Sequence, residues 1–421
     1  MHTHTLILGA GLAGLSTAYH LEQAGRRDYI LLEQENEPGG WARSIYKKGF
    51  TFDFSGHLLH LHTPYGKKLV TRLLGKNLHR VKRRAWIYTH DSRVPFPFQA
   101  NLFALPPKER AACLNGLASA ATRRYKTPPA HFKAWCLRAF GKGIYEQFLR
   151  PYNTKLWGRS PRELTAEWCN PFIPRPTLAQ IRRSAQHPLD KTLGYNAYFY
   201  YPQKGGCGAL VHALAKQVQV QTNTRVTRID LKNKTVYAGS KKFTFDKLVN
   251  TLPLPVFLKL LQQEPDLTPL AGHLCAANVT VYQVALQGKS TPFSWIYCPD
   301  KQDPFYRVGM YSSFASANAP KDCYSLYVEI PGSRTVQERT IWQALQKKGI
   351  VKSADKKLFS FWQKIPFAYA IYDKKRTKTV QTVLKKLQQK NCFCLGRYGR
   401  WEYSFMETAL LQGKEAAQKL L

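Results

Sequence analysis

The sequence predicts an α/β fold in which a Rossmann-like nucleotide-binding domain is interleaved with a helical domain and an antiparallel-sheet domain. Three observations predict it: a glycine-rich turn between an apolar strand and a helix near the start, a β-meander in the middle, and a closing strand and helix. At 421 residues, 44% of them apolar, the chain is long enough for more than one domain and a large core. No internal repeat is visible.

The first unit expected is βαβ: a strand at 3–8, a turn at 9–14, a helix at 12–24 that ends at a glycine, and a strand at 28–33. Gly9, Gly11 and Gly14 permit a tight turn, close approach of a pyrophosphate, and close packing of the helix on the strand. Glu33 ends the second strand, where an acid bonds a ribose hydroxyl. The spacing therefore predicts a dinucleotide site.

Later segments return to this domain. Alternating apolar and polar residues around Asn233 and Gly239 predict a β-meander over 225–253. The other elements expected are helices and loops at 100–190, a helix at 209–218, and strands at 247–251, 278–286, 323–330 and 392–396, with a helix at 406–420. We therefore expect the nucleotide domain in three parts (1–90, 201–265 and 390–421), a mainly helical cap (91–200) and an antiparallel-sheet substrate domain (266–389).

The charge balance is strongly basic. The chain has 63 Lys and Arg against 26 Asp and Glu, a net charge of +37, which favours anionic partners such as nucleotides. The densest run, "GKKLVTRLLGKNLHRVKRR" (66–84), has eight Lys and Arg and no acid. We interpret it as a solvated basic face, because no nucleic-acid recognition module accompanies it.

Cysteine usage and hydropathy indicate the compartment. The nine cysteines are scattered, with no CxxC pair or nearby histidine cluster, which predicts free thiols, a reducing compartment and no metal site. The apolar stretch 6–18 has no basic lead-in, and no run reaches the ~20 apolar residues of a membrane span. We therefore expect a cytoplasmic protein without a signal peptide or transmembrane segment.

Two further motifs favour FAD over NAD as the nucleotide. "PGGWARS" (38–44) places a second glycine pair soon after the ribose acid, and it resembles the extended dinucleotide motif of FAD enzymes in the amine-oxidase-like superfamily. "LGRYGRWEY" (395–403) resembles the C-terminal flavin segment of the same superfamily, in which the last helix points its N-terminus at the cofactor.

Longer stretches resemble UDP-galactopyranose mutase, more the eukaryotic type than the short bacterial one. They occur in the family's order and run nearly end to end: "GFTFDFSGHLLHLH" (49–62), "VPFPFQANLFALP" (94–106), "GKGIYEQFLRPYNTKLWGRSPREL" (141–164), "YNAYFYYPQKGGCGAL" (195–210), "WIYCPDKQDPFYRVGMYS" (295–312) and "GRYGRWEYSFMETALLQGKEAA" (396–417). The FAD motifs are shared with amine oxidases and protoporphyrinogen oxidases, whereas "RPYNTKLWG" and "DPFYR" are more specific.

The resemblance implies a flavoenzyme that uses reduced FAD as a nucleophile. In the family, flavin N5 attacks the anomeric carbon of a UDP-sugar, and the flavin N5–sugar adduct opens and recloses with the other ring size before UDP is re-attached. Pyranose and furanose forms interconvert without net redox change. The flavin must first be reduced, and NAD(P)H is the expected external reductant, entering the flavin cleft because no second dinucleotide fingerprint is present.

The resemblance also implies roles position by position. The catalytic residues are His57 beside the flavin ring, Arg307 on the diphosphate, and Tyr369 and Tyr403 on the substrate phosphates. The substrate pocket adds Phe96, Phe98, Gln99, Trp157, Asn196 and Tyr297. The cofactor contacts are Gly9, Gly11, Gly14, Glu33, Gly39, Gly40, Arg43, Ser44, Gly56, His57, Gly205, Gly206, Val226, Gly396 and Arg397, of which Gly205 and Gly206 belong to a mobile loop.

The chain also departs from the family. Ser55 replaces the first glycine of a GGH motif, Phe96 stands where tyrosine is common, and "YAIYD" (369–373) lacks a proline after its first tyrosine. Phe172 occupies the position of a second pyrophosphate-binding arginine, and Arg175, three residues on, is a candidate for the same anion. Loss of one of two charge-assisted contacts is expected to weaken diphosphate binding by about 1.5–3 kcal/mol.

Three functions remain open at this point. The leading one is an FAD-dependent UDP-sugar mutase of the UDP-galactopyranose type. The second is an FAD-dependent oxidoreductase of the amine oxidase or protoporphyrinogen oxidase type, which Phe172 and the aromatic residues around the cleft favour. The third is a flavin-bound scaffold with a basic surface, although no DNA-binding motif or amphipathic anchor supports it.

Overall fold

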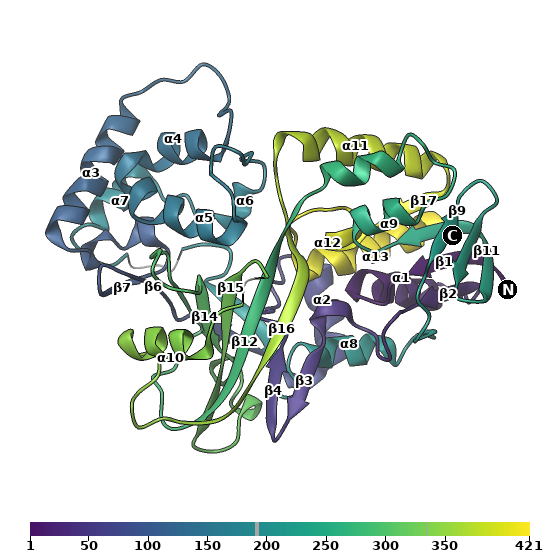
Figure 1. The fold of residues 1–421 in the computed structure, drawn as a ribbon, viewed down its shortest axis with the longest axis horizontal. Helices are drawn as coiled ribbons and strands as arrows, with labels where there is room; N and C mark the ends of the chain where they lie inside the picture. Colours follow the sequence, from purple (N-terminus) through teal and green to yellow (C-terminus); the bar gives the residue numbers. More distant parts are fainter. Residues whose placement is uncertain (190–192, 334) are drawn as a thin grey trace.

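A six-stranded sheet, a seven-stranded sheet and a group of helices form the molecule (Figure 1). The computed structural model describes residues 1–189, 193–333 and 335–421. Both sheets take strands from separate parts of the chain, and the six-stranded sheet draws on residues 2–32, 228–250 and 392–394. The interleaved α/β fold expected from the sequence is therefore confirmed.

The six-stranded sheet carries the βαβ unit. Its order is β2-β1-β11-β10-β9, and β17 pairs with the C-terminal end of β11. Its strands are β1 (His2–Leu8), β2 (Tyr29–Leu32), β9 (Arg228–Asp230), β10 (Thr235–Ala238), β11 (Lys241–Asn250) and β17 (Cys392–Cys394). Leu6 and Leu8 join one hydrophobic core and Ile7 joins another, so β1 is covered on both faces, as a continuous apolar run in a parallel strand predicts.

Helices cover both faces of this sheet. One face carries α1 (Leu12–Gln23), α2 (Pro64–Leu74), α8 (Gly208–Ala215) and α13 (Met406–Leu420), and the other carries α9 (Leu254–Leu260) and α11 (Lys374–Gln389). The predicted helix at 209–218 ends earlier, at Ala215, and the predicted strand at 247–251 is the end of the longer β11. Both chain ends lie at this side of the molecule (Figure 1).

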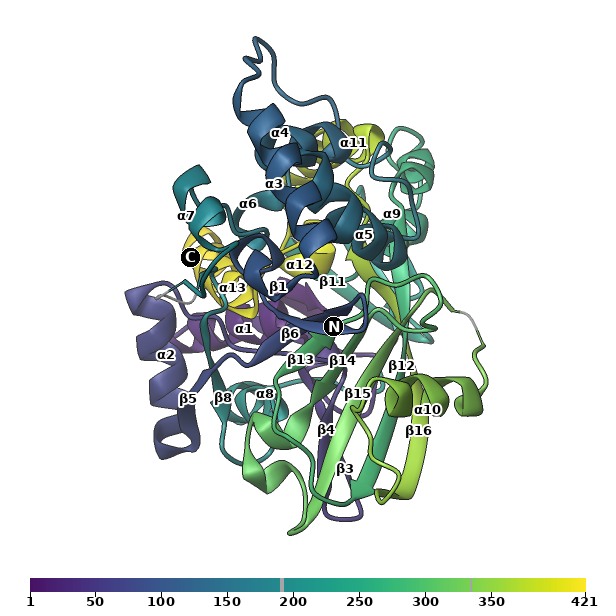
Figure 2. The same cartoon turned by 90° about the vertical axis from the view of Figure 1, so that its left-hand side faces the viewer.

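The seven-stranded sheet has the order β16-β12-β15-β14-β13-β6-β7. Its strands are β6 (Ala85–Thr89), β7 (Ser92–Pro95), β12 (Ala276–Gln287), β13 (Trp295–Tyr297), β14 (Arg307–Met310), β15 (Cys323–Pro331) and β16 (Lys356–Ala370), with α10 (Glu338–Lys347) packed beside it (Figure 2). All neighbours pair antiparallel except β13 and β6. The boundary expected at residue 90 falls within the β6–β7 hairpin, so these two strands extend this sheet.

The remaining helices gather at one end of the molecule (Figure 1). They are α3 (Pro107–Ala121), α4 (Phe132–Ile144), α5 (Arg150–Trp157), α6 (Cys169–Phe172) and α7 (Leu178–Arg183). The short helix α12 (Gly396–Gly399) lies apart from this group, beside α13. Two short antiparallel pairs, β3 (Ser44–Lys47) with β4 (Phe50–Asp53) and β5 (Leu78–Lys82) with β8 (Tyr198–Pro202), connect the parts.

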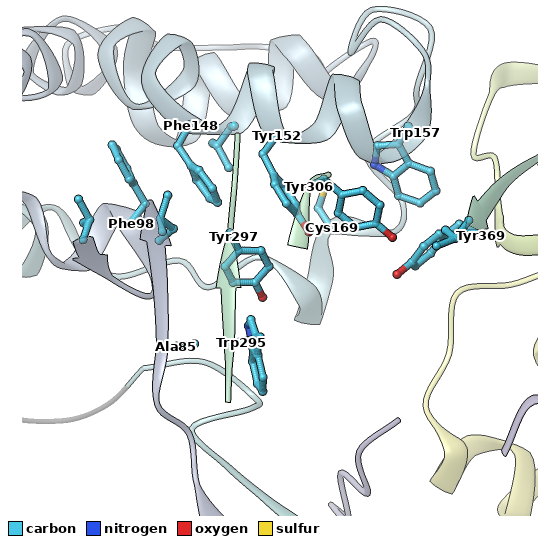
Figure 3. Packing of buried hydrophobic residues seen from close by; sticks show 14 of the residues in the cluster. Ala85, Phe98, Phe148, Tyr152, Trp157, Cys169, Trp295, Tyr297, Tyr306 and Tyr369 are labelled. Carbon is cyan, nitrogen blue, oxygen red and sulfur yellow. The ribbon is translucent and has the colours of Figure 1, made fainter. Parts of the chain in front are cut away.

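One core joins the helical group to the seven-stranded sheet. Phe148, Tyr152 and Trp157 of the helical group pack with Tyr297 and Tyr369 of the sheet (Figure 3). In the described residues, no helix is long and apolar enough to cross a membrane. All nine cysteines, which lie within those residues, are free.

Candidate active site

The glycine turn after β1 leaves space beside the N-terminus of α1. Gly14 lets the helix approach the turn, because a Cβ there would lie 2.0 Å from the Gly9 carbonyl oxygen. A Cβ on Gly11 would meet no atom of residues 1–189, 193–333 or 335–421 within 4 Å, so the turn is open on that side. No side chain of the described residues caps the first N–H groups of α1. Room and free donors at a helix N-terminus suit a phosphate group.

Glu33 lies against the same turn. Its Oε2 accepts a hydrogen bond from the backbone N–H of Ala10 at 2.9 Å, and its side chain is buried. The N–H of Gly39 donates to the Ala10 carbonyl at 2.7 Å, which brings the second glycine pair beside the first. The Cβ position of Gly40 faces the Cα of Gly11 at 3.6 Å. The structure thus assembles the predicted glycines and the acid in one place.

A buried carboxylate, Asp53, connects β4 to the loop at 205–208. It accepts hydrogen bonds from the hydroxyl of Ser44 at 2.6 Å, the hydroxyl of Tyr201 at 2.7 Å and the backbone N–H of Cys207 at 3.0 Å. Burial raises the pKa of Asp53 to about 6. Sequence reasoning missed this residue, although a single acid within the apolar run "FTFDF" was a visible signal.

Other predicted cofactor residues lie around this network. Arg43 donates to the Gly40 carbonyl at 3.0 Å and pairs with Glu37 at 3.2 Å. Gly206 has a positive φ of 59° and sits so close to Ser44 that a Cβ would lie 2.4 Å from the serine oxygen. The neighbouring Gly205 carbonyl accepts a hydrogen bond from the Tyr46 hydroxyl at 2.9 Å.

His57 follows Gly56 next to this loop. The thiol of Cys207 donates to the His57 carbonyl at 2.8 Å, and a Cβ on Gly56 would lie 2.4 Å from the hydroxyl of Tyr327. Burial, and then the charge of Arg397, lowers the pKa of His57 to about 4, so the imidazole is neutral at pH 7. Its Nδ1 is buried without a hydrogen-bond partner among the described residues. Such an orphaned nitrogen suits a polar atom of a bound ring.

Arg307 forms a two-pronged ion pair with Glu329. The Nε of Arg307 donates to Oε2 of Glu329 at 2.5 Å and Nη2 donates to Oε1 at 2.6 Å. Ser55 donates to the same Oε1. The Nη2 of Arg307 also reaches the hydroxyl of Tyr369 at 3.4 Å. Glu329 is 1% exposed, and sequence reasoning missed it because it lies within a strand that reads as core, "CYSLYVEI".

Tyr369 and Tyr403 form an aromatic cluster with Trp157 and Phe172. Their ring centroids are 5.6 Å apart, and Trp157 lies 5.7 Å from Tyr369 and 6.4 Å from Tyr403 (Figure 3 shows Trp157 and Tyr369). Phe172 packs on Tyr403 at 4.1 Å. The Arg397 guanidinium lies 5.2 Å and 4.7 Å from the centroids of Tyr369 and Tyr403.

The C-terminal segment connects this cluster to the glycine turn. A Cβ on Gly396 would lie 2.8 Å from the Cβ of Ala13 in α1, and the next residue is Arg397. One end of the predicted cofactor site therefore lies at the turn and the other at the tyrosines. The open turn, the orphaned Nδ1 of His57 and this continuity fit a flavin dinucleotide.

Residues of the predicted nucleoside pocket separate into two groups. Phe96 and Tyr297 face each other, with ring centroids 5.0 Å apart, beside a cavity of about 270 Å³ that Phe96 lines. Phe98 and Gln99 are buried instead: Phe98 stacks on Phe148 at 5.3 Å, and Gln99 donates to the Pro174 carbonyl at 2.5 Å. The buried side chains of Phe98 and Gln99 therefore pack beneath the pocket wall and support it.

Two other positions lie outside the tyrosine cluster. Val226 packs against the core that contains Leu32. The N–H of Thr224, two residues before Val226, donates to the Glu33 carbonyl at 2.7 Å, so this segment adjoins the predicted ribose acid. Arg175, suggested as a replacement for the missing arginine, lies over the ring of Trp135 at 5.7 Å and lines a separate cavity with Leu117 and Ile181. In the structure, therefore, Arg175 does not take the place of an arginine at position 172.

Asn196 contacts a buried arginine, Arg83, which belongs to the basic run 66–84 that the sequence predicts to be solvated. Its Oδ1 accepts a hydrogen bond from Arg83, which is 5% exposed. The other seven Lys and Arg residues of 66–84 are exposed. The expectation of a fully solvated basic face is therefore wrong at this one position, because the end of β5 turns Arg83 inward.

The comparisons with known proteins concern the family and the fold of the chain. The model of one family, described as flavin containing amine oxidoreductase, matches residues 12–421. A solved structure of reduced UDP-galactopyranose mutase is similar at a TM-score of 0.93 and 26% identity, covering 99% of this chain and 93% of that one.

Other relatives carry different activities in their names. Protoporphyrinogen oxidase of Bos taurus is 24% identical over 83% of this chain and 80% of its own length. The structure of a CLA-producing fatty acid isomerase from P. acnes superposes with a TM-score of 0.67 at 15% identity, covering 99% of this chain and 98% of that one, which shows the shared fold alone.

Proposed function

Because the chain belongs to the flavin containing amine oxidoreductase family, we propose that it binds FAD and, with the flavin reduced, interconverts the pyranose and furanose forms of a UDP-sugar. The observation that carries this proposal is the similarity to reduced UDP-galactopyranose mutase over almost the whole chain. The arrangement of Arg307, Tyr369 and Tyr403 in one cluster supports it.

The arrangement around the glycine turn indicates which residues would hold the cofactor. Gly11 and the N-terminus of α1 would receive the diphosphate, Glu33 a ribose, and His57 the flavin ring. When bound and reduced, the flavin supplies the nucleophile for the anomeric carbon, and NAD(P)H is the proposed reductant. His57 stays neutral at pH 7, because its pKa is about 4, so it offers the ring a hydrogen-bonding nitrogen without adding a charge.

The chain's own groups would bind and orient the substrate. Burial raises the pKa of Tyr403 to about 12 and also raises that of Tyr369, so both phenols stay protonated and donate hydrogen bonds to phosphate oxygens at neutral pH. Arg307 uses two of its five N–H groups on the Glu329 carboxylate and keeps others for the diphosphate. Trp157 packs against Tyr369 and Phe172 against Tyr403, and these rings would limit the access of water to the two phenols.

The experiment is a redox-controlled assay. Flavin-loaded protein, oxidised or reduced with dithionite, is incubated with UDP-galactofuranose, and UDP-galactopyranose is followed by chromatography. We expect conversion with reduced protein only, and little conversion by Arg307→Lys, which keeps the charge and loses the planar fork. Conversion by oxidised protein alone, or protein purified without flavin, would contradict the proposal.

An oxidoreductase is the second candidate. The specific observation in its favour is the packing of Phe172 against Tyr403, where a charged clamp is absent, together with the sequence similarity to protoporphyrinogen oxidase. This function predicts hydrogen peroxide release or reduction of an added acceptor, and no effect of UDP on the flavin spectrum. The same protein preparation tests both.

The compartment is also a proposal. Nine free cysteines support a reducing environment such as the cytoplasm, where thiols stay unpaired.

A further inference from the structure

Arg83 carries a buried positive charge at the edge of the proposed substrate pocket. Its side chain follows β5 and reaches the segment at 193–196 and the turn before Pro97. Burial lowers the pKa of Arg83 to about 10, so the guanidinium remains charged at neutral pH.

The partners of Arg83 are all uncharged. Nη2 donates to the carbonyls of Phe96 at 3.0 Å and Leu193 at 3.1 Å, and Nη1 donates to Oδ1 of Asn196. Among the described residues, none of the ion pairs involves Arg83. A buried charge without a counter-charge is costly, and an anion bound at the site would remove that cost.

The charge lies where the nucleotide is expected. The guanidinium sits 4.8 Å from the centroid of the Phe96 ring, and both residues line the cavity of about 270 Å³. Tyr297, which faces Phe96, lies in the field of two arginines: burial raises the pKa of its hydroxyl, while Arg307 and Arg83 both lower it. Because both guanidinium groups act on the Tyr297 hydroxyl, Arg307 and Arg83 lie around the same part of the proposed pocket.

Resting on the proposed function, we propose that Arg83 supplies a second positive charge to the diphosphate of the UDP-sugar. Within the part of the chain that the structure describes, three of its five N–H groups donate hydrogen bonds, so that the Nε–H and one N–H on Nη1 remain for phosphate oxygens.

The pocket needs this charge for a physical reason. The diphosphate of a UDP-sugar is a dianion, and the Arg307–Glu329 pair is neutral as a unit, so Arg307 offers N–H donors but little net attraction. Phe172 offers no charge, and Arg175 lies over Trp135. Arg397 donates to the carbonyls of Ala368 and Ser404 next to the proposed flavin. Among the described residues that line the cavity on the nucleoside side, Arg83 is the buried cation, whereas Arg84 is exposed to solvent.

The test compares binding of UDP and of uridine, which lacks the phosphates, to flavin-loaded protein by calorimetry. Arg83→Gln is expected to weaken UDP about ten- to hundredfold and uridine much less, as loss of a charge-assisted hydrogen bond predicts. Arg83→Lys, which keeps the charge and serves if the glutamine variant misfolds, should lose less. The matched control is Lys82→Gln, because Lys82 is an exposed cation at the end of β5 and is not among the described residues that line the cavity; its effect should stay within about twofold.

A rescue variant separates a phosphate contact from a structural role. Phe172→Arg in the Arg83→Gln background should restore part of the UDP affinity and leave uridine unchanged. UDP binding unchanged in Arg83→Gln, or UDP and uridine weakened equally, would overturn the inference while the proposed function stands. Wild-type protein that binds no UDP would overturn the proposed function and this inference together.

Discussion

Glu329 holds the proposed diphosphate arginine in place. Its carboxylate is almost fully buried and accepts from Arg307 at two oxygens and from Ser55. Glu329→Gln should lower the free energy of unfolding by about 1.5–3 kcal/mol, because charge-assisted hydrogen bonds are lost and Arg307 keeps an uncompensated charge. Urea denaturation measures this change.

The control for that variant is a pair of the same type at the surface. Glu146→Gln breaks an ion pair with Arg150 whose side chains are 34% and 53% exposed, and it should cost less than about 1 kcal/mol. UDP should stabilise Glu329→Gln more than wild type, because it brings an anion to the unpaired guanidinium. Equal stability losses in the two variants would show that burial of the Arg307 pair has no energetic consequence.

His57 predicts a pH dependence of known sign. Its pKa is about 4 in the folded state and 6.5 without the fold, so the unfolded chain takes up a proton first as the pH falls. The contribution of neutral His57 to stability is therefore present above pH 6.5 and is lost as the pH falls towards 4. The unfolding free energy of wild type minus that of His57→Asn should be larger at pH 7 than at pH 4.5. A difference independent of pH would contradict this assignment.

Some site residues could be predicted from the sequence, and others could not. The glycines and Glu33 were predictable because their roles depend on short spacing within one βαβ unit. Glu329 and Arg83 were not, because their roles depend on partners more than 20 residues away, Arg307 and Asn196. An acid in a core-like strand and an arginine in a basic run each have a commonplace interpretation, and only the packing changes it.

At the scale of elements, the position of the loop at 205–208 depends on the absence of a side chain at Gly206. Gly206 has a φ of 59°, and a Cβ would lie 2.4 Å from Ser44 Oγ and 2.6 Å from Asp53 Oδ1. Gly206→Ala should therefore cost both the roughly 1–2 kcal/mol of a left-handed residue and the displacement of the Asp53 network. Urea denaturation and the flavin content after purification measure the effect.

Gly239 supplies a matched control. Its φ is 60°, nearly the same, but a Cβ there would meet no atom of the described part of the chain within 4 Å. Gly239→Ala should lose only the conformational part, about 1–2 kcal/mol, and should retain its flavin. If both variants lost the same stability and kept equal flavin, close packing of the loop on Asp53 would have no role.

Elements with a strong local pattern were predicted, and those defined by long-range pairing were not. β1, α1 and α13 match the expected ranges to within about two residues, because apolar runs and glycines bound them. The longest strand, β16, was missed: its sequence "KKLFSFWQKIPFAYA" carries Lys, Gln and Pro, and most of it is only partly buried. Pairing with β12 along its length makes it a strand, and its end places Tyr369 in the site.

At the scale of the whole molecule, the net charge of +37 has an energetic consequence. Like charges spread over one surface repel and destabilise the compact state, and salt screens this repulsion. The Debye length falls from about 30 Å at 0.01 M salt to about 10 Å at 0.1 M. The melting temperature of the protein should therefore rise over this range of sodium chloride.

The same screening should weaken ligand binding. Salt therefore has opposite effects on repulsion within the folded protein and on attraction of an anionic ligand, and the two can be measured separately. The buried ion pair of Arg307 is screened little, whereas the attraction between the basic surface and an approaching dianion is screened strongly. The association rate constant of UDP should fall as the salt concentration rises, while the melting temperature increases. Stopped-flow flavin absorbance measures this rate constant. As a control, sucrose at equal osmolality should leave the rate constant nearly unchanged after correction for viscosity. A melting temperature that falls with sodium chloride would mean that local ion pairs outweigh the long-range repulsion among the lysines and arginines.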